Sequence, residues 1–265
     1  MGESIVVTSG KGGVGKTTTS ANLGCALALM EHRVLLVDAD IGLRNLDVVM
    51  GLENRIVFDL VDVVDGFCRF GQALIRDRRF SSLHLLPAAQ TKDKTAVSPE
   101  QMRRLCLQLK KEFDYVIIDS PAGIEQGFKN AVAGADRAVV VTTPEVAAVR
   151  DADRIIGLLE ATELEAPGLI INRIRPEMMR RREMMTVEEI VDILAIDLVG
   201  LVPEDEKIVK YANSGQPACL SEDSTAGQAY INIARRLVGE DIQVFTPFEG
   251  NGLLGRLKRL MGLAQ

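Results

Sequence analysis

Short apolar runs alternate with longer segments of helical period along almost the whole chain, and this alternation constrains the fold more than any other feature. The runs are rich in Val, Ile and Leu without regular polar positions, as expected for strands that are covered on both faces. Helical segments between successive buried strands are typical of a parallel sheet. We therefore predict an α/β fold, with a mostly parallel β-sheet flanked by helices on both faces.

The expected elements can be placed along most of the sequence. Strands are predicted at residues 4–8, 33–37, 83–87, 115–118, 138–143, 168–172 and 198–202. Helices are predicted at residues 17–30, 99–112, 126–133, 147–161, 187–195 and 225–238. Hydrophobic residues make up 47% of the chain, which is enough for a sizeable core in one compact domain.

The character of the sequence changes after about residue 239. The following stretch contains Pro247, Gly250 and Gly252, which are typical of a connecting segment. We predict a nucleotide-binding domain over residues 1–240, a linker over 241–252 and a separate C-terminal segment over 253–265.

A glycine-rich loop lies between the first expected strand and the first expected helix. It reads Gly10-Lys11-Gly12-Gly13-Val14-Gly15-Lys16-Thr17 and matches the phosphate-binding pattern G-x-x-x-x-G-K-[ST]. Glycine allows backbone N–H groups to surround phosphate oxygens, and the helix that follows directs its positive end at the same anion. Lys16 adds a full charge, the Thr17 hydroxyl can reach Mg²⁺, and Thr18 lies next to both. The loop predicts a nucleotide phosphate site.

Carboxylates follow two of the expected strands directly. The run at residues 34–37 leads into Asp38-Ala39-Asp40, and the run at 115–118 leads into Asp119. Because the carboxyl ends of parallel strands meet at one edge of a sheet, we expect these acids to lie near the phosphate loop. Phosphoryl transfer needs Mg²⁺ and a group that orients the attacking water, and carboxylates serve both purposes.

No other catalytic set competes with this one. The two histidines, His32 and His84, lie outside every motif, and no Ser, His and Asp arrangement suggests acyl transfer. The four cysteines have neither a CxxC pair nor metal-ligand spacing, which argues against a zinc or iron–sulfur site. Water is therefore the expected nucleophile.

Two further strand ends are candidates for binding the base. Asn172-Arg173 follows the run at 168–171, and Pro203 follows the run at 198–202. The Asn172 amide can both donate and accept hydrogen bonds, which suits adenine, and Pro203 can pack on a ring. Asn172 as an ordinary turn residue remains the alternative. The N-K-x-D motif of guanine-binding proteins is absent, so ATP is the expected nucleotide.

The C-terminal segment has a basic amphipathic pattern. On a helical wheel, Leu253, Leu254, Leu257, Leu260 and Met261 share one side, whereas Arg256, Lys258 and Arg259 lie outside that arc. A helix that docks on the domain is one interpretation. The preceding linker and the three cations favour attachment to an anionic membrane surface.

These motifs together resemble the MinD family of cell-division ATPases. The loop Gly10 to Thr17 is similar to the deviant Walker A loop of the MinD, ParA and nitrogenase-iron-protein class, and the resemblance covers nearly the whole chain. Segments at residues 40–47 and 119–125 are similar to the two switch loops of the family. Those at 86–90 and 172–176 resemble cyanobacterial or plastid forms.

The resemblance implies a role for each site residue. Lys11 acts on the nucleotide of a partner subunit in a dimer, and Lys16 acts within its own subunit. Asp40 orients the attacking water, while Asp38 and Asp119 lie near Mg²⁺ together with Thr17. The backbone N–H of Gly123 contacts the γ-phosphate, and the adenine lies at Asn172, Arg173 and Pro203.

It also implies cofactors, partners and a location. ATP and Mg²⁺ are the cofactors, and an ATP-dependent homodimer, a MinC-like inhibitor, a MinE-like activator and the membrane are the partners. With no signal peptide, the expected location is cytoplasmic or plastid stromal, and peripheral on the membrane when ATP is bound.

Three alternatives remain open from the sequence. A ParA-type DNA-partitioning ATPase would need a basic surface, but the formal charge is -6 and no nucleic acid partner is expected. An electron-transfer iron protein would need paired cysteines at a dimer interface. A nucleotide-dependent scaffold without hydrolysis would not need Lys16, Asp40 and Asp119 together.

Overall fold

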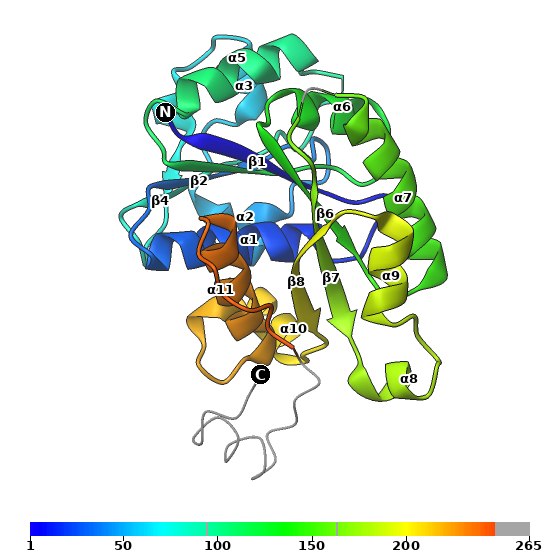
Figure 1. Ribbon diagram of the computed structural model, residues 1–265. Helices are drawn as coiled ribbons and strands as arrows, with labels where there is room; N and C mark the ends of the chain where they lie inside the picture. Colours follow the sequence, from blue (N-terminus) through cyan, green and yellow to red (C-terminus); the bar gives the residue numbers. More distant parts are fainter. Residues whose placement is uncertain (94, 163, 247–265) are drawn as a thin grey trace.

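The computed structural model describes residues 1–93, 95–162 and 164–246, which form one sheet with helices on both faces (Figure 1). The strand order is β3-β4-β2-β5-β1-β6-β7-β8. The strands are β1 (Glu3–Thr8), β2 (Val34–Asp38), β3 (Ile75–Arg76), β4 (Leu83–Leu86), β5 (Tyr115–Asp119), β6 (Arg137–Thr142), β7 (Gly168–Ile174) and β8 (Asp197–Pro203). All neighbouring strands are parallel except β3 and β4. The predicted α/β fold is confirmed.

Helices occupy most of the connections between strands. The longer helices are α1 (Lys16–Leu29), α5 (Pro99–Leu109), α6 (Gln126–Ala133), α7 (Val146–Glu160), α9 (Val187–Leu194) and α11 (Thr225–Leu237). The shorter ones are α2 (Leu46–Met50), η1 (Glu53–Arg55), α3 (Leu60–Val64), α4 (Phe70–Ala73), α8 (Pro176–Arg180), α10 (Lys207–Asn213) and η2 (Ala218–Leu220). The six helices predicted between residues 17 and 238 are all present.

Alternate residues of the central strands feed two separate cores. Val6 of β1 belongs to the core beneath α3, α5, α6, α7 and α9, whereas Ile5 and Val7 belong to the core beneath α1, α2 and α11. Successive side chains of a strand point to opposite faces, so an apolar strand buried on both sides supplies both cores. This explains why the strand interiors are mostly apolar instead of alternating between apolar and polar residues.

One sequence prediction needs correction, and several short elements were not predicted. Asn172 and Arg173 do not follow the strand; they lie inside β7, where the pairing with β8 is irregular and Arg173 has a positive φ of 57°. The antiparallel strand β3 has two residues and was missed, because so short a run carries no periodic signal. The short helices α2, α3, α4, α8 and α10 were missed for the same reason.

The C-terminal end of the domain turns back on itself. After α11 the chain reverses at Gly239, whose φ is 90°, and residues 240–246 return alongside the helix. The Phe245 N–H donates to Asn232 Oδ1 at 3.4 Å, and Val244 packs against the first core. The remaining expected linker, 247–252, and the amphipathic segment 253–265 lie outside the described residues.

Within the described ranges, no helix is both long and apolar enough to span a bilayer.

The packing of α1 on β2 gives a stability prediction. Leu36 is fully buried against α1, where a Cβ built on Gly24 would lie 2.5 Å from its Cδ2. Leu36→Ala should lower the free energy of unfolding by about 2 to 5 kcal/mol, because the buried cavity cannot collapse fully. Urea unfolding measures this loss. Leu107→Ala, at an α5 position that is 44% exposed, is the matched control. Equal losses in both variants would contradict the assigned core.

Candidate nucleotide-binding site

The glycine-rich loop joins β1 to α1. Gly15 caps α1 with a φ of 98°, and Gly13 has a φ of 81°, both in the left-handed region that favours glycine. The backbone of α7 approaches so closely that a Cβ on Gly10 would lie 2.1 Å from the Asp151 carbonyl oxygen. Nothing lies within 4 Å of a Cβ built on Gly12 or Gly13. The loop therefore has the shape of an anion cradle at a helix N-terminus.

The side chains of α1 bring a lysine and two hydroxyls to Asp119. Lys16 is only 8% exposed and lies near the carboxylates of Asp119 and Asp40. Ser20 Oγ donates to Asp119 Oδ1 at 3.0 Å, and the Thr17 side chain also hydrogen-bonds to this carboxylate. The structure thus places the predicted pair Thr17 and Asp119 together. Ser20 was not predicted, although its position one helical turn after Lys16 and Thr17 could have indicated it.

Asp38 lies beside Asp119 and holds the following loop. The two residues are register partners on β2 and β5, and both are buried. One carboxylate oxygen of Asp38 accepts from the Asp40 N–H at 3.0 Å, and the other accepts from the Leu46 N–H at 3.2 Å. Asp38 therefore fixes both ends of the segment that carries Asp40 to the start of α2.

Burial sets the charge state of this cluster. Loss of solvent, reinforced by neighbouring Asp119, raises the pKa of Asp38 to about 8. Burial likewise raises the pKa of Asp119 to about 6, although hydrogen bonds and Lys16 oppose the shift. Burial lowers the pKa of Lys16, and the nearby carboxylates counteract this. Two adjacent buried carboxylates are costly unless a cation compensates them.

The donor set fits a magnesium ion. Mg²⁺ prefers hard oxygen ligands and is usually held by one or two carboxylates together with substrate phosphates and water. Asp119 and the Thr17 hydroxyl supply such oxygens beside the phosphate loop, with Asp38 adjacent.

The second predicted loop is tied to the phosphate loop. Gly123 has a φ of 90°, and its N–H donates to the Ser9 carbonyl at 3.2 Å. For this N–H to contact a γ-phosphate, as the sequence resemblance implies, it must exchange that partner.

The predicted base-binding residues converge at the ends of β7 and β8. Asn172 Nδ2 donates to the Val14 carbonyl at 2.8 Å, so this amide also supports the phosphate loop. A Cβ on Gly15 would lie 2.4 Å from the same nitrogen, which is why glycine is needed there. A small cavity is lined by Gly15, Thr18, Asn172, Arg173, Pro203, Glu204, Asp205, Ile208, Val209 and Tyr230. Ile208 and Val209 on α10 and Tyr230 on α11 were missed, because ordinary apolar periodicity gives no sign of a ligand.

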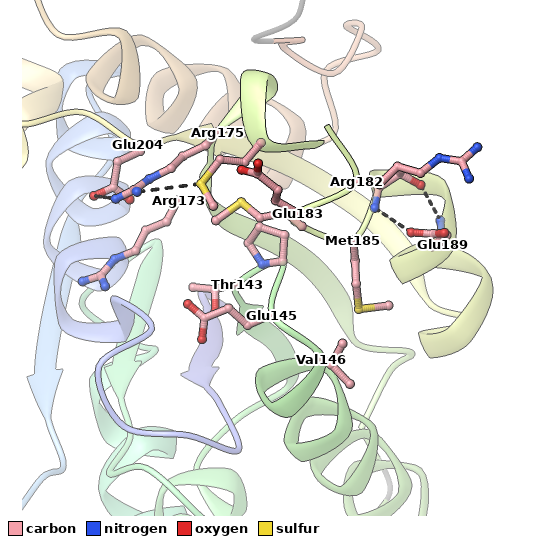
Figure 2. A pocket seen from close by; sticks show the side chains of 14 residues that line it. Thr143, Glu145, Val146, Arg173, Arg175, Arg182, Glu183, Met185, Glu189 and Glu204 are labelled. Atoms are coloured by element: carbon pink, nitrogen blue, oxygen red, sulfur yellow. Dashed lines mark hydrogen bonds and ion pairs between the residues drawn. The ribbon is translucent and has the colours of Figure 1, made fainter. Parts of the chain in front are cut away.

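A larger cavity of about 860 Å³ adjoins this one (Figure 2). Figure 2 shows Arg173, Arg175 and Glu204 together on one side, with Glu145 and Val146 across from them. Arg173 and Glu204 line both cavities. Lys11 reaches this region, since its Nζ lies 3.4 Å from Glu145 Oε2. The larger cavity therefore adjoins the candidate base site, and none of the phosphate-loop residues line it.

Comparisons with known proteins agree with this geometry. Residues 5–218 match the family model "CobQ/CobB/MinD/ParA nucleotide binding domain". The septum site-determining protein MinD of Bacillus subtilis is 60% identical over 99% of both chains. Its counterpart from Synechocystis is 55% identical over 98% of both, so the likeness includes cyanobacterial forms without being confined to them.

Solved structures of similar proteins have the same fold. The MinC:MinD cell division protein complex of Aquifex aeolicus gives a TM-score of 0.86 at 49% identity, covering 92% of this chain and 99% of that one. MinD of Pyrococcus horikoshii, complexed with Mg-ADP, gives 0.82 at 31% identity and covers 91% and 100%.

The raised pKa of Asp38 makes stability depend on pH. The folded chain binds more protons than the unfolded chain between pH 3.8 and about 8, so the free energy of unfolding falls as pH rises through this window. Between about pH 6.5 and 8, we expect a loss of at most about 1.4 kcal/mol per pH unit from this carboxyl. The lowered pKa of His84 acts in the opposite direction, but only below 6.5.

Urea unfolding of the nucleotide-free chain at several pH values measures this slope. Asp38→Asn should flatten it, because the amide does not titrate. An identical slope in both proteins would show that Asp38 is not the group responsible.

Proposed function

The chain belongs to the MinD family of septum site-determining proteins, and from this premise we propose that it is a Mg·ATP-hydrolysing switch that positions the division site. The observation that carries the proposal is the convergence of Lys16, Asp119, Asp38 and Asp40 at the glycine-rich loop. The P. horikoshii relative, complexed with Mg-ADP, supports the same cofactors for this chain.

Each group of residues has a separate role in the proposed hydrolysis. Backbone N–H groups of the loop and the Lys16 ammonium bind the β- and γ-phosphates, and the base occupies the pocket beside Asn172. Thr17 and Asp119 would hold Mg²⁺, which would supply positive charge to offset the phosphate charge. Asp40 lies at the half-buried edge of the cluster, where its carboxylate can orient a water towards the γ-phosphate. The buried environment strengthens each of these electrostatic contacts.

A second copy of the chain completes the switch in this proposal. The Lys11 side chain is 44% exposed, and its ammonium lies at Glu145, outside the glycine-rich loop. Its ion pair with Glu145 is exposed and contributes less than about 1 kcal/mol, so a partner's phosphate can displace it. Exposed apolar side chains border the site on three separate segments, at Leu43, Ile124 and Val146. Such side chains support a contact with another subunit across the nucleotide.

Dimerisation provides the link to the membrane. One amphipathic segment at residues 253–265 binds a bilayer weakly, whereas two on one dimer act together and raise the overall affinity by about 10² to 10⁴. ATP thereby places the cytoplasmic or stromal protein on an anionic membrane surface, and hydrolysis releases it. The membrane-bound dimer recruits a MinC-like inhibitor, and a MinE-like activator stimulates hydrolysis. The MinC:MinD complex of A. aeolicus supports the first of these partners.

Substitution of Asp40 tests the chemistry. Asp40→Asn should lower the rate of phosphate release by about 10² to 10⁴, because the amide cannot accept the proton of the attacking water. Binding of ATP should be retained, as measured by equilibrium titration. Hydrolysis at the wild-type rate in the variant would remove Asp40 from the mechanism.

Sedimentation with anionic liposomes tests the switch. Asp40→Ala, used to slow hydrolysis, should sediment with ATP but not with ADP. Deletion of residues 253–265 should abolish sedimentation, while leaving ATP turnover without lipid unchanged. If sedimentation is absent with either nucleotide, membrane attachment is wrong, and binding to DNA would then support the partitioning alternative.

A further inference from the structure

The cavity at the base site has a smaller volume than a site for a purine nucleoside usually has. Its volume is about 60 Å³, whereas small-molecule sites generally measure about 300 to 1,000 Å³. One wall consists of Pro203, Glu204 and Asp205 at the end of β8, and Ile208 and Val209 of α10 form the outer wall. A base held in this cavity would therefore lie against Ile208 and Val209 on one side, whereas β8 on the other side is held in the sheet by its pairing with β7.

Helix α10 is the wall that can move. None of its residues, Lys207 to Asn213, is buried, and Val209 is 64% exposed. The Ile208 side chain is only partly buried where it packs against the second core. Elements with few buried apolar contacts open at low free-energy cost, so α10 is poised to move relative to the sheet.

Polar contacts add to this packing and hold α10 against the loop that precedes α11. The Tyr211 hydroxyl lies 2.6 Å from Ser221 Oγ and donates to Asp223 Oδ1 at 2.8 Å. Lys207 Nζ lies 2.9 Å from the other Asp223 oxygen and donates to the Asp223 carbonyl. We call Lys207, Tyr211, Ser221 and Asp223 the latch. Hydrogen bonds from Ser221, Lys207 and Tyr211 keep the pKa of Asp223 well below its usual range, so the carboxylate stays ionised near neutral pH.

The far end of α10 adjoins the switch segment. A Cβ on Gly215 would lie 2.5 Å from Gly51 Cα, so the turn after α10 touches the turn after α2. Arg79 bridges them, donating to the Gly215 carbonyl at 3.1 Å and to the Met50 carbonyl at 3.0 Å. Helix α2 begins at Leu46, whose N–H is held by Asp38. These contacts anchor the C-terminal end of α10. Any movement of the helix is therefore expected at the end held by the latch.

We propose that Tyr211 and Asp223 are positioning residues that hold α10 over the base pocket and set how fast a purine nucleotide enters and leaves. The inference rests on the proposed function, because it assumes that the base binds at this cavity. With the latch closed, Ile208 and Val209 cover the base; with it open, the base exchanges with solvent.

Stopped-flow fluorescence tests the latch. The probe is Mg·ADP with an N-methylanthraniloyl group on its ribose, and the variant is Tyr211→Phe, which removes only the hydroxyl. Loss of its hydrogen bonds should raise both the association and the dissociation rate by about fivefold to tenfold, because α10 opens more often. Asp223→Asn, which also removes the ion pair to Lys207, should act in the same direction.

Two controls separate the latch from a general loss of structure. Asn213→Ala changes an exposed residue of the same helix that lines neither the cavity nor the latch, so its rates should match the wild type. Inorganic tripolyphosphate with Mg²⁺ occupies only the phosphate loop, so its affinity should be the same in every variant.

The possible results distinguish failure of the latch from failure of the base site and of the proposed function. Unchanged exchange rates in both latch variants, even with a lowered melting temperature, would overturn the latch, because the contacts would then be purely structural. A wild-type chain that binds tripolyphosphate but not the labelled nucleotide would overturn the base site as well. A wild-type chain that binds neither probe would contradict the proposed function itself.

Discussion

The site depends on two carboxylates and one ammonium group that are held out of water at the edge of the sheet. Asp38 and Asp119 are direct neighbours on β2 and β5, and Lys16 begins the helix that follows the phosphate loop. In water such charges would interact weakly. In a buried site, two carboxylates beside a single ammonium group are costly in free energy, and a bound cation stabilises them strongly. The same burial raises the pKa of both acids. A bound divalent cation would offset the two neighbouring carboxylates.

The fold makes this arrangement possible by bringing distant segments to one edge. The parallel strands β1, β2, β5, β7 and β8 all end at that edge, and each carries a different part of the site into the loop that follows. Asp38 holds the 40–46 segment through two backbone hydrogen bonds. Asn172 holds the phosphate loop through the Val14 carbonyl. Loops fixed at both ends by a rigid sheet can change partners without disturbing the core.

The sequence was informative wherever a strong local signal coincided with a strand end. The glycine-rich loop, Asp38 and Asp119 were placed correctly, because a buried strand followed by a polar residue at a sheet edge leaves few geometries. It was less informative where the site uses ordinary apolar residues or polar contacts between distant segments. Ile208, Tyr230 and the contact between Tyr211 and Asp223 have no periodic signature, since they depend on how α10 and α11 pack. Arg173 in a left-handed conformation within β7 is a tertiary effect that no strand propensity predicts.

The dependence of turnover on protein concentration tests the account most directly. If Lys11 of one subunit acts on the nucleotide of another, phosphate release per chain at saturating Mg·ATP should rise as the protein is concentrated and then level off. Lys11→Ala should show no such rise. A turnover per chain that stays constant from nanomolar to micromolar protein would contradict the account, because the site would then be complete within a single chain.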